Sequence, residues 1–162
     1  MDTRELDYDA IRNLFARYSQ AYDFGDAEGV ARMFTEDGVL DTTAPAPEFG
    51  GVFRGPDEIR KHVESATSYF AGRIRTSPAQ SVVNLDGDVA RATSYAITTR
   101  DYGPPEIPGD LTHSELFTTG MYFDELRRDG GEWKFVRREY RHDAHADVLS
   151  RVGRPVAEGV AA

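Results

Sequence analysis

Residues 17–26 read Arg17-Tyr18-Ser19-Gln20-Ala21-Tyr22-Asp23-Phe24-Gly25-Asp26. They end an amphipathic helix that we expect to run from about Asp7 to Phe24. Its apolar residues recur at helical spacing and form one stripe, made of Ile11, Leu14, Phe15, Tyr18 and Tyr22. Asp23 adjoins this stripe just before Gly25, which breaks the helix. The pattern therefore predicts a helix that packs by an aromatic face and ends at a carboxylate.

Asp23 has two interpretations. A carboxyl group held against aromatic rings is costly to ionise, so its pKa can rise into the range that is useful for proton transfer. Alternatively, Asp23 only ends the helix and caps a following backbone amide. The residues themselves leave both interpretations open.

Composition favours one globular domain and excludes several functional classes. The chain has 162 residues, no cysteine and a net charge of −9. Its acidic residues are spread along the sequence, which argues against nucleic acid or an anionic membrane as a partner. Without cysteine there is no disulfide, thiolate metal site or thiol catalysis. We expect one domain over residues 1–145 and a poorly ordered tail over residues 146–162.

No apolar run approaches the roughly 20 residues that span a bilayer. The N-terminus is charged and has no apolar core of a signal peptide. These features predict a cytoplasmic protein.

Beyond Asp26 the pattern changes from helical to extended. We expect a short helix from Ala27 to Phe34, a turn at Glu36-Asp37-Gly38, an extended stretch from Val39 and a helix from Pro56 to about Phe70. Four strands follow, separated by turns or, after the second, by a proline-rich loop (Tyr102 to Asp110): Ile74 to Leu85, Val89 to Arg100, Leu111 to Leu126, and Trp133 to about His145. This order predicts an α+β fold, with three N-terminal helices on one face of a curved, mostly antiparallel sheet that forms a conical pocket.

Several motifs along the chain resemble one family. They are Arg17-Tyr18-x-x-Ala21-Tyr22-Asp23-x-Gly25-Asp26, Met33-Phe34-x-Glu36-Asp37-Gly38, Phe53-x-Gly55-Pro56-Asp57-Glu58-Ile59, Asp86-Gly87-Asp88-Val89-Ala90, Gly120-x-Tyr122-x-Asp124-x-Leu126 and Gly130-Gly131-x-Trp133. Together they resemble the SnoaL-like domains of the nuclear transport factor 2-like superfamily, in the branch of scytalone dehydratase-like enzymes. The resemblance spans about Leu6 to Arg141.

The resemblance implies a small, cofactor-free protein with a pocket for a small hydrophobic molecule. Relatives catalyse dehydration, isomerisation, polyketide cyclisation, hydrogen halide elimination or epoxide hydrolysis, while others only bind ligands or serve as structural subunits of oxygenases. It also implies a homodimer, formed through the open face of the sheet. Fold alone does not choose among these functions.

In the dehydratase-like branch, an Asp at the position of Asp23 and a Tyr at Tyr18 or Tyr22 line the pocket. A His on the first long strand usually pairs with that Asp. The matching strand here, from Arg75 to Asn84, has no His, and Thr76 or Gln80 stands in that region.

Histidines elsewhere could replace the missing partner. With no bulge in its strand, His113 would share a face with Phe117 and Met121, and this face could be pocket wall. His142 could line the pocket mouth or lie at a solvent edge. His62 is interpreted as a surface or wall residue. A metal site at His142 and His145 is not expected, because the two side chains point to opposite faces of a strand.

Two hypotheses follow. In the first, the protein is a cofactor-independent lyase or isomerase, with Asp23 as general base or acid, Tyr18 or Tyr22 on the substrate oxygen, and His113 or His142 relaying a second proton. Tyr95, Phe117 and Met121 would contact the substrate. In the second, the same pocket binds a ligand without chemistry, or the chain is a structural subunit. The absence of a strand histidine favours the second hypothesis.

Overall fold

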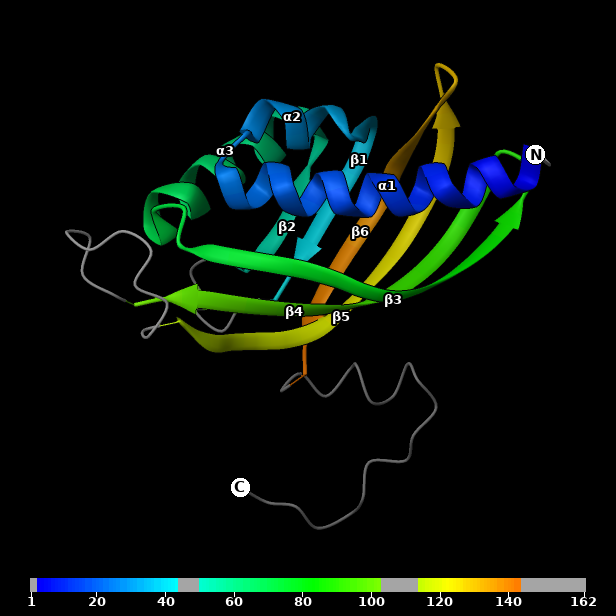
Figure 1. The fold of residues 1–162 in the computed structure, drawn as a ribbon. Coiled ribbons are helices and arrows are strands. Elements are labelled where there is room, and N and C mark those ends of the chain that lie inside the picture. The colour runs from blue at the N-terminus through cyan, green and yellow to red at the C-terminus, as the bar shows by residue number, and fades with distance from the viewer. Residues whose placement is uncertain (1–2, 44–49, 103–113, 144–162) are drawn as a thin grey trace, which may run out of the picture.

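The computed structural model describes residues 3–43, 50–102 and 114–143. These ranges hold three helices and six strands (Figure 1). In chain order they are α1 (Thr3–Phe24), α2 (Ala27–Arg32), β1 (Phe34–Thr42), β2 (Gly51–Arg54), α3 (Gly55–Phe70), β3 (Ile74–Asp86), β4 (Val89–Asp101), β5 (Ser114–Asp129) and β6 (Glu132–His142). The α+β class is as predicted, and α3 follows the first extended stretch as the order of the elements predicted, so only α1 and α2 precede the sheet.

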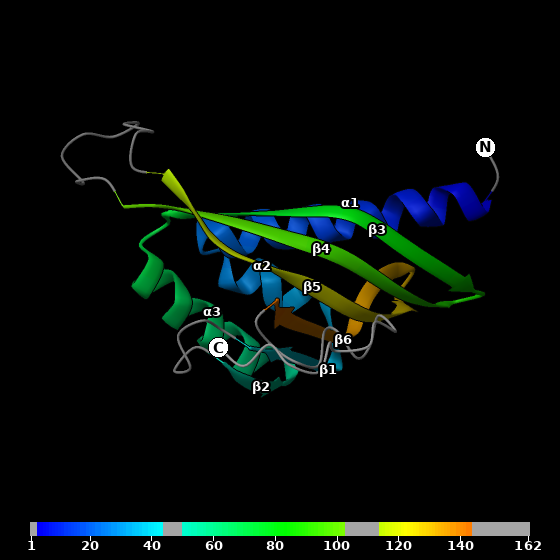
Figure 2. The same cartoon turned by 90° about the horizontal axis from the view of Figure 1, so that it is seen from below.

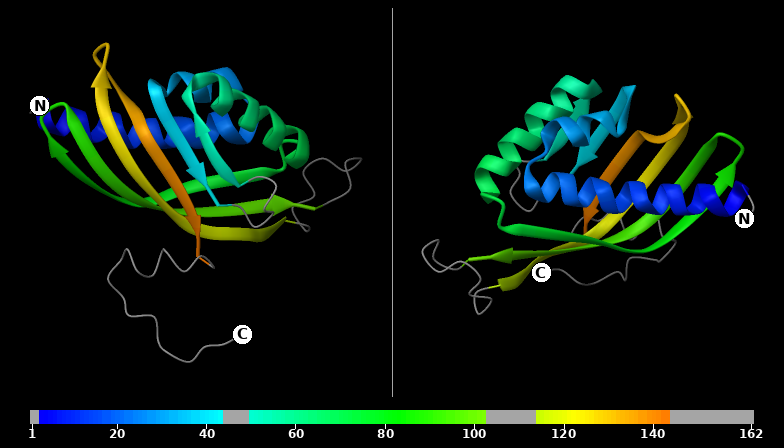
Figure 3. Two further views of the ribbon diagram at one scale, coloured as in Figure 1. Left: turned by 180° about the vertical axis from the view of Figure 1, so that it is seen from behind. Right: turned by 45° about the horizontal axis from the view of Figure 1, so that its top comes forward.

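The six strands form one mixed sheet in the order β2-β1-β6-β5-β4-β3. The predicted four-stranded antiparallel meander is β3 to β6, and β1 joins its β6 edge in parallel. The sheet curves strongly, and the helices lie on its concave side (Figures 1 and 2). From behind, the long strands present a convex face that none of the described helices covers (Figure 3).

The core lies between the helices and the concave face. From α1 it takes Ile11, Leu14, Phe15 and Tyr18, which are buried as the stripe predicted. From α3 it takes Ile59 and Val63, and the sheet contributes Phe34, Leu40, Leu126 and Phe135. The apolar spacing of the two helices therefore fixes which side of the sheet they cover.

The turn after α1 depends on Gly25, whose φ is +77°. Asp26 then caps α2 by accepting a hydrogen bond from the Gly29 amide at 2.8 Å. Such a cap begins a new helix within two residues of the end of the last. Asp23 therefore lies in the last turn of α1, just before the chain changes direction into α2.

Two boundaries differ from the prediction. The second helix ends at Arg32, and Phe34 begins β1. The predicted turn at residues 36–38 lies inside β1, where the pairing with β6 shifts register between Phe34 and Val39. The turn-forming residues thus lie at a register shift within the strand and do not end it.

Part of the prediction lies outside the described residues. This applies to the proline-rich loop beyond Tyr102, to His113, to His145 and to the tail over residues 146–162. In the described ranges, no helix combines the length and apolar character needed to cross a membrane.

Candidate functional site

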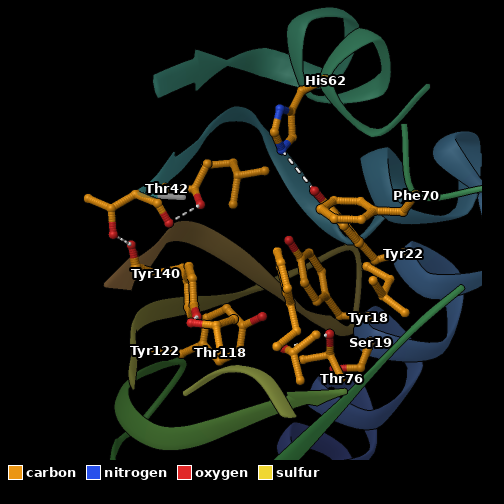
Figure 4. A pocket seen from close by; sticks show the side chains of 15 residues that line it. Tyr18, Ser19, Tyr22, Thr42, His62, Phe70, Thr76, Thr118, Tyr122 and Tyr140 are labelled. Carbon is orange, nitrogen blue, oxygen red and sulfur yellow. Dashed lines mark hydrogen bonds between the residues drawn. The ribbon is translucent and has the colours of Figure 1, made fainter. Parts of the chain in front are cut away.

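A cavity of about 90 Å³ lies between the helices and the concave face of the sheet. Figure 4 shows its lining side chains converging from α1, α3 and the sheet. Its walls are aromatic or carry hydroxyl groups, and they consist of Tyr18, Ser19, Tyr22, Leu40, Thr42, Thr43, His62, Phe70, Ile74, Thr76, Thr98, Phe117, Thr118, Tyr122 and Tyr140. Several of these are only half-buried, such as Phe70, Thr76 and Phe117, so the cavity reaches the surface.

The Asp23 carboxylate lies directly behind one wall of this cavity. Its side chain is 5% exposed. Oδ2 accepts a hydrogen bond from the Thr76 backbone amide at 2.6 Å, while the buried Oδ1 has no hydrogen-bond partner. Ser19 and Tyr22 precede Asp23 on α1, and these two residues and Thr76 all line the cavity.

Burial dominates the electrostatics of Asp23. Desolvation raises its pKa to about 6, against the opposing effects of the Thr76 amide, the Thr76 side chain and the Arg75 charge. A carboxyl group with this pKa is ionised at neutral pH and is still basic enough to accept a proton. The expected cap is thus made to an amide of β3, 53 residues away, and not to the following turn.

His62 forms the polar part of the opposite wall. It projects from α3, is buried, and places Nε2 3.1 Å from the Tyr22 hydroxyl (Figure 4). Its ring stacks on Phe53 with the centroids 4.1 Å apart. Desolvation lowers the His62 pKa to about 4 and raises that of Tyr22, so both groups are neutral at neutral pH. The pair offers a neutral hydrogen-bonding edge to the cavity.

Hydroxyl groups from the sheet complete the polar lining. The Thr76 and Thr98 hydroxyl oxygens are 3.2 Å apart, and those of Thr118 and Tyr140 are 3.4 Å apart. Hydroxyl groups can donate or accept, so they can adapt to carbonyl or hydroxyl groups of a ligand.

A buried cation lies beneath two of the cavity tyrosines. The Arg138 guanidinium carbon is 3.8 Å from the Tyr122 ring centroid and 4.2 Å from that of Tyr18. Its Nε is 3.5 Å from Asp124 Oδ1, and both side chains are fully buried. Burial raises the pKa of Asp124 and of both tyrosines, so the two phenols stay protonated. The buried Arg138–Asp124 pair thus packs against the rings of Tyr18 and Tyr122 on the side away from the cavity.

The structure brings together only some of the predicted site residues. Tyr18, Tyr22 and Phe117 line the cavity, with Asp23 behind its wall. His142 ends β6 two residues beyond Tyr140 and is not among the lining residues. His113 precedes β5 and lies outside the described residues.

Tyr95 and Met121 require a correction, because they lie on the convex face. Tyr95 is 50% exposed, and Met121 is its Cα partner on β5. The register of β4 and β5 shifts between Thr98 and Thr99, which pair with Thr118 and Leu116. This bulge leaves Phe117 as an extra residue, so the expected alternation from Phe117 to Met121 is broken.

Sequence reasoning left His62 open between a surface and a wall position, and the structure makes it a buried residue of the cavity wall. A usable signal was present, because His62 lies three residues after Ile59 and four before Ala66, both on the buried face of α3. Its contact with Tyr22 joins two helices and could not be found from spacing within either one.

No metal site is apparent in the described part of the chain. Within it, no group of three or more His, Asp or Glu side chains is placed to hold an ion.

A small α+β protein with an aromatic cavity and a buried carboxylate is the class that this fold and site define. The model of the SnoaL-like domain matches residues 3–139, so the chain belongs to the SnoaL-like family. No functionally curated protein matches it.

Solved structures share the fold. An Asp-to-Asn variant of Rv3472, a protein of unknown function from Mycobacterium tuberculosis, has a TM-score of 0.74 and 26% identity, covering 93% of this chain and 86% of that one. A putative scytalone dehydratase from Novosphingobium aromaticivorans has a TM-score of 0.69 and 26% identity, covering 87% of both chains. ActVI-ORFA from Streptomyces coelicolor has a TM-score of 0.69 and 23% identity, covering 85% of this chain and 96% of that one.

Proposed function

We propose that this protein is a cofactor-independent lyase or isomerase, of dehydratase or polyketide cyclase type, that acts on a hydrophobic carbonyl or aromatic substrate. The observation that carries the proposal is the Asp23 carboxylate, which is buried beside the cavity with one oxygen unpartnered and its pKa raised to about 6. An unpartnered buried charge is costly, so its presence favours a functional role.

Asp23 acts as the general base. Since it lies behind the wall, the substrate proton reaches it through the hydroxyl group of Thr76, which lines the cavity and whose side chain favours the charged form of Asp23. Thr76 passes its own proton to Asp23 as it receives the substrate proton, so the hydroxyl group is unchanged at the end of the step.

Tyrosine hydroxyl groups hold the substrate oxygen as negative charge develops on it. Burial raises the pKa of Tyr18 and Tyr22, so both remain neutral donors. Hydrogen bonds from preorganised neutral donors stabilise an enolate in a site with little water. His62 orients the Tyr22 hydroxyl group through the contact between them.

A different function, ligand binding or a structural role without chemistry, is the second candidate. It is favoured by the Asp23 surroundings, because no imidazole of the described residues hydrogen-bonds to this carboxylate and a backbone amide holds Oδ2. In that case the cavity would bind a small hydrophobic molecule and leave its covalent structure unchanged.

We propose a homodimer formed through the convex face of the sheet. Val82, Val89, Tyr95, Ile97 and Leu116 all lie on this face and are 43–64% exposed. Large exposed apolar side chains on one face of a sheet favour an interface there. A cytoplasmic location remains a prediction, which cell fractionation would test.

Proton transfer can be tested without the natural substrate. Acetophenone in D₂O exchanges its methyl protons slowly at neutral pH, and NMR follows the loss of the methyl signal. We expect the wild-type protein to accelerate this exchange and Asp23→Asn to lose at least about 100-fold of the acceleration, the usual contribution of a general base.

Asp26→Asn is the matched control, because Asp26 is an exposed carboxylate three residues away and asparagine caps a helix as well as aspartate does. It should exchange acetophenone as the wild-type protein does. Binding of acetophenone without any acceleration in the wild-type protein would support the non-catalytic candidate.

A further inference from the structure

Arg100 lies at the edge of the cavity in an unusual environment. It is the second residue after Thr98 on β4, so both side chains lie on the concave face of the sheet. The guanidinium carbon is 5.1 Å from the Tyr69 ring centroid, 5.2 Å from that of Phe70 and 5.6 Å from that of Phe117. Tyr102 supplies a fourth ring at 5.1 Å. Phe70 and Phe117 also line the cavity.

Three elements meet at this place. The end of β4 lies close to the end of α3 and the beginning of β5 (Figures 1 and 2). Phe70 is the last residue of α3, and its ring is 5.7 Å from that of Phe117 in an edge-to-face arrangement. The rings fix Arg100 from several sides, which reduces the side-chain entropy that a ligand contact would otherwise cost.

Arg100 has no ion pair with any carboxylate of the described residues. Its Cα partner on β5 is Glu115, yet the two side chains do not form a salt bridge. Other arginines of this acidic chain do pair, such as Arg137 with Asp41 and Arg128 with Asp7. Acidic residues outnumber basic ones by 28 to 19, yet within the described residues the charge of Arg100 lies against aromatic rings and not against a carboxylate.

Within the described residues, the guanidinium group of Arg100 contacts aromatic rings. Aromatic rings engage the guanidinium group through its charge and its faces, whereas its five N–H groups point outward in its plane. That fork matches a carboxylate group in shape and balances its single charge.

Because the cavity is small, part of a larger substrate must lie outside it, near the Arg100 guanidinium group. A cavity of roughly 150 Å³ is known to hold one benzene molecule, whereas this one measures about 90 Å³. A larger substrate must therefore extend beyond the cavity, and Phe70 and Phe117 form a half-buried aromatic exit towards Arg100.

We infer that Arg100 binds a carboxylate group of the substrate, so that the protein selects hydrophobic molecules that carry one carboxylate at the end remote from the cavity. The inference rests on the proposed function in that the bound molecule is taken to be a substrate. The binding preference itself requires no turnover. Arg100 is a specificity-determining residue and takes no part in the proton transfer.

The test compares two probes of the same shape, 3-phenylpropanoate and its neutral amide, 3-phenylpropanamide. Isothermal titration calorimetry gives the affinity of each for the wild-type protein and for Arg100→Met, which retains much of the packing but not the charge. We expect the wild-type protein to bind the acid about tenfold or more tightly than the amide, as for a charge-assisted hydrogen bond. Arg100→Met should lose this preference and keep its affinity for the amide.

Two controls separate charge from geometry. Arg91→Met removes an exposed arginine from the same strand and should retain the acid preference. Arg100→Lys keeps the charge without the planar fork and should retain only part of it. Thermal unfolding of each variant shows whether it is folded.

Equal affinity for the two probes, no binding of either, or an acid preference that survives in Arg100→Met would overturn the inference. Its failure is distinct from failure of the proposed function, because the acid preference is measured by binding alone, whereas the role of Asp23 is measured by proton exchange. If the wild-type protein prefers 3-phenylpropanoate but does not accelerate proton exchange, the proposed role of Arg100 stands and that of Asp23 is refuted.

Discussion

At the scale of single residues, the position of Asp23 explains its chemistry. Gly25 ends α1 immediately after it, and the curvature of the sheet brings the Thr76 amide to its Oδ2 atom. Only one of the two carboxylate oxygens is satisfied, so desolvation exceeds the stabilising contacts and raises the pKa to about 6. The sequence placed this carboxylate beside an aromatic stripe, but its partner on β3 depends on tertiary structure.

The raised pKa of Asp23 makes stability depend on pH. The folded protein holds the proton to about pH 6, whereas the ordinary value is 3.8. The tighter binding of this proton by the folded state therefore stabilises the protein below about pH 4, and the stabilisation is lost as the pH rises through 6. From pH 4 to 7, the free energy of unfolding of the wild-type protein should fall relative to that of Asp23→Asn by roughly 2–3 kcal/mol.

Urea denaturation of both proteins at the two pH values measures this difference. Other titrating groups, including Asp124, are common to both and cancel in the comparison. A difference in stability that is the same at pH 4 and pH 7 would mean that the Asp23 pKa is not raised.

Thr76→Val tests the relay at the same scale. The variant keeps the backbone amide that binds Asp23 and the branched shape of the side chain, but it removes the hydroxyl group. We expect the exchange of acetophenone to slow by at least about tenfold, because the carboxylate loses its path to the substrate. Thr118→Val removes a cavity hydroxyl that contacts Tyr140 and should be much closer to wild type. Unchanged exchange in Thr76→Val would exclude the relay.

At the scale of helices and strands, sequence patterns predicted most of the elements and failed where pairing is irregular. Apolar spacing predicted the bounds of α1 and α3 to within a few residues. The turn at Gly87 did the same for β3 and β4. The bulge at Phe117 could not be foreseen, because nothing in the alternation of β5 marks an extra residue until it is paired with β4. That one bulge decides why Phe117 lines the cavity while Met121 does not.

The end of α3 gives a stability prediction for one element. Ala71 follows the helix in the left-handed conformation, with φ of 52°. This conformation strains any residue with a Cβ atom by roughly 1–2 kcal/mol. After allowance for the greater freedom of glycine in the unfolded chain, Ala71→Gly should stabilise the protein by about 0.5–1 kcal/mol.

The same substitution inside a helix should have the opposite sign. Ala10→Gly, at an exposed position of α1, is expected to destabilise by about 1 kcal/mol. Chemical denaturation measures both. Destabilisation by both substitutions would show that Ala71 is not strained.

At the scale of the whole molecule, the two faces of the sheet have different roles. The concave face and the helices enclose the core and the cavity, whereas the convex face exposes apolar side chains. Figure 3 shows that the described helices leave the convex face open. The order of the elements predicted this layering, because a sheet with helices on one side leaves its other side bare. Tyr18, Tyr22 and Phe117 were predicted for the site, but the contact of Tyr22 with His62 and the place of Thr76 beside Asp23 join separate elements and could not be predicted.

The convex face makes the homodimer testable. Ile97→Lys places a charge on this face, where Ile97 is 43% exposed. We expect sedimentation velocity to show a dimer for the wild-type protein and a monomer for this variant, because burying an unpaired charge is costly. Leu6→Lys, which changes an equally exposed leucine of α1, should remain dimeric. A monomeric wild-type protein would refute this interface.

The most direct test of the central claim is the pH profile of acetophenone exchange by the wild-type protein. If the Asp23 carboxylate is the base, the rate attributable to the protein should rise with pH and level off, with a midpoint near 6, the value to which burial raises the Asp23 pKa. The profile of Asp23→Asn should follow that of the uncatalysed exchange and lack this midpoint. A wild-type profile without that midpoint, or one that Asp23→Asn reproduces, would contradict the assignment of Asp23 as the base.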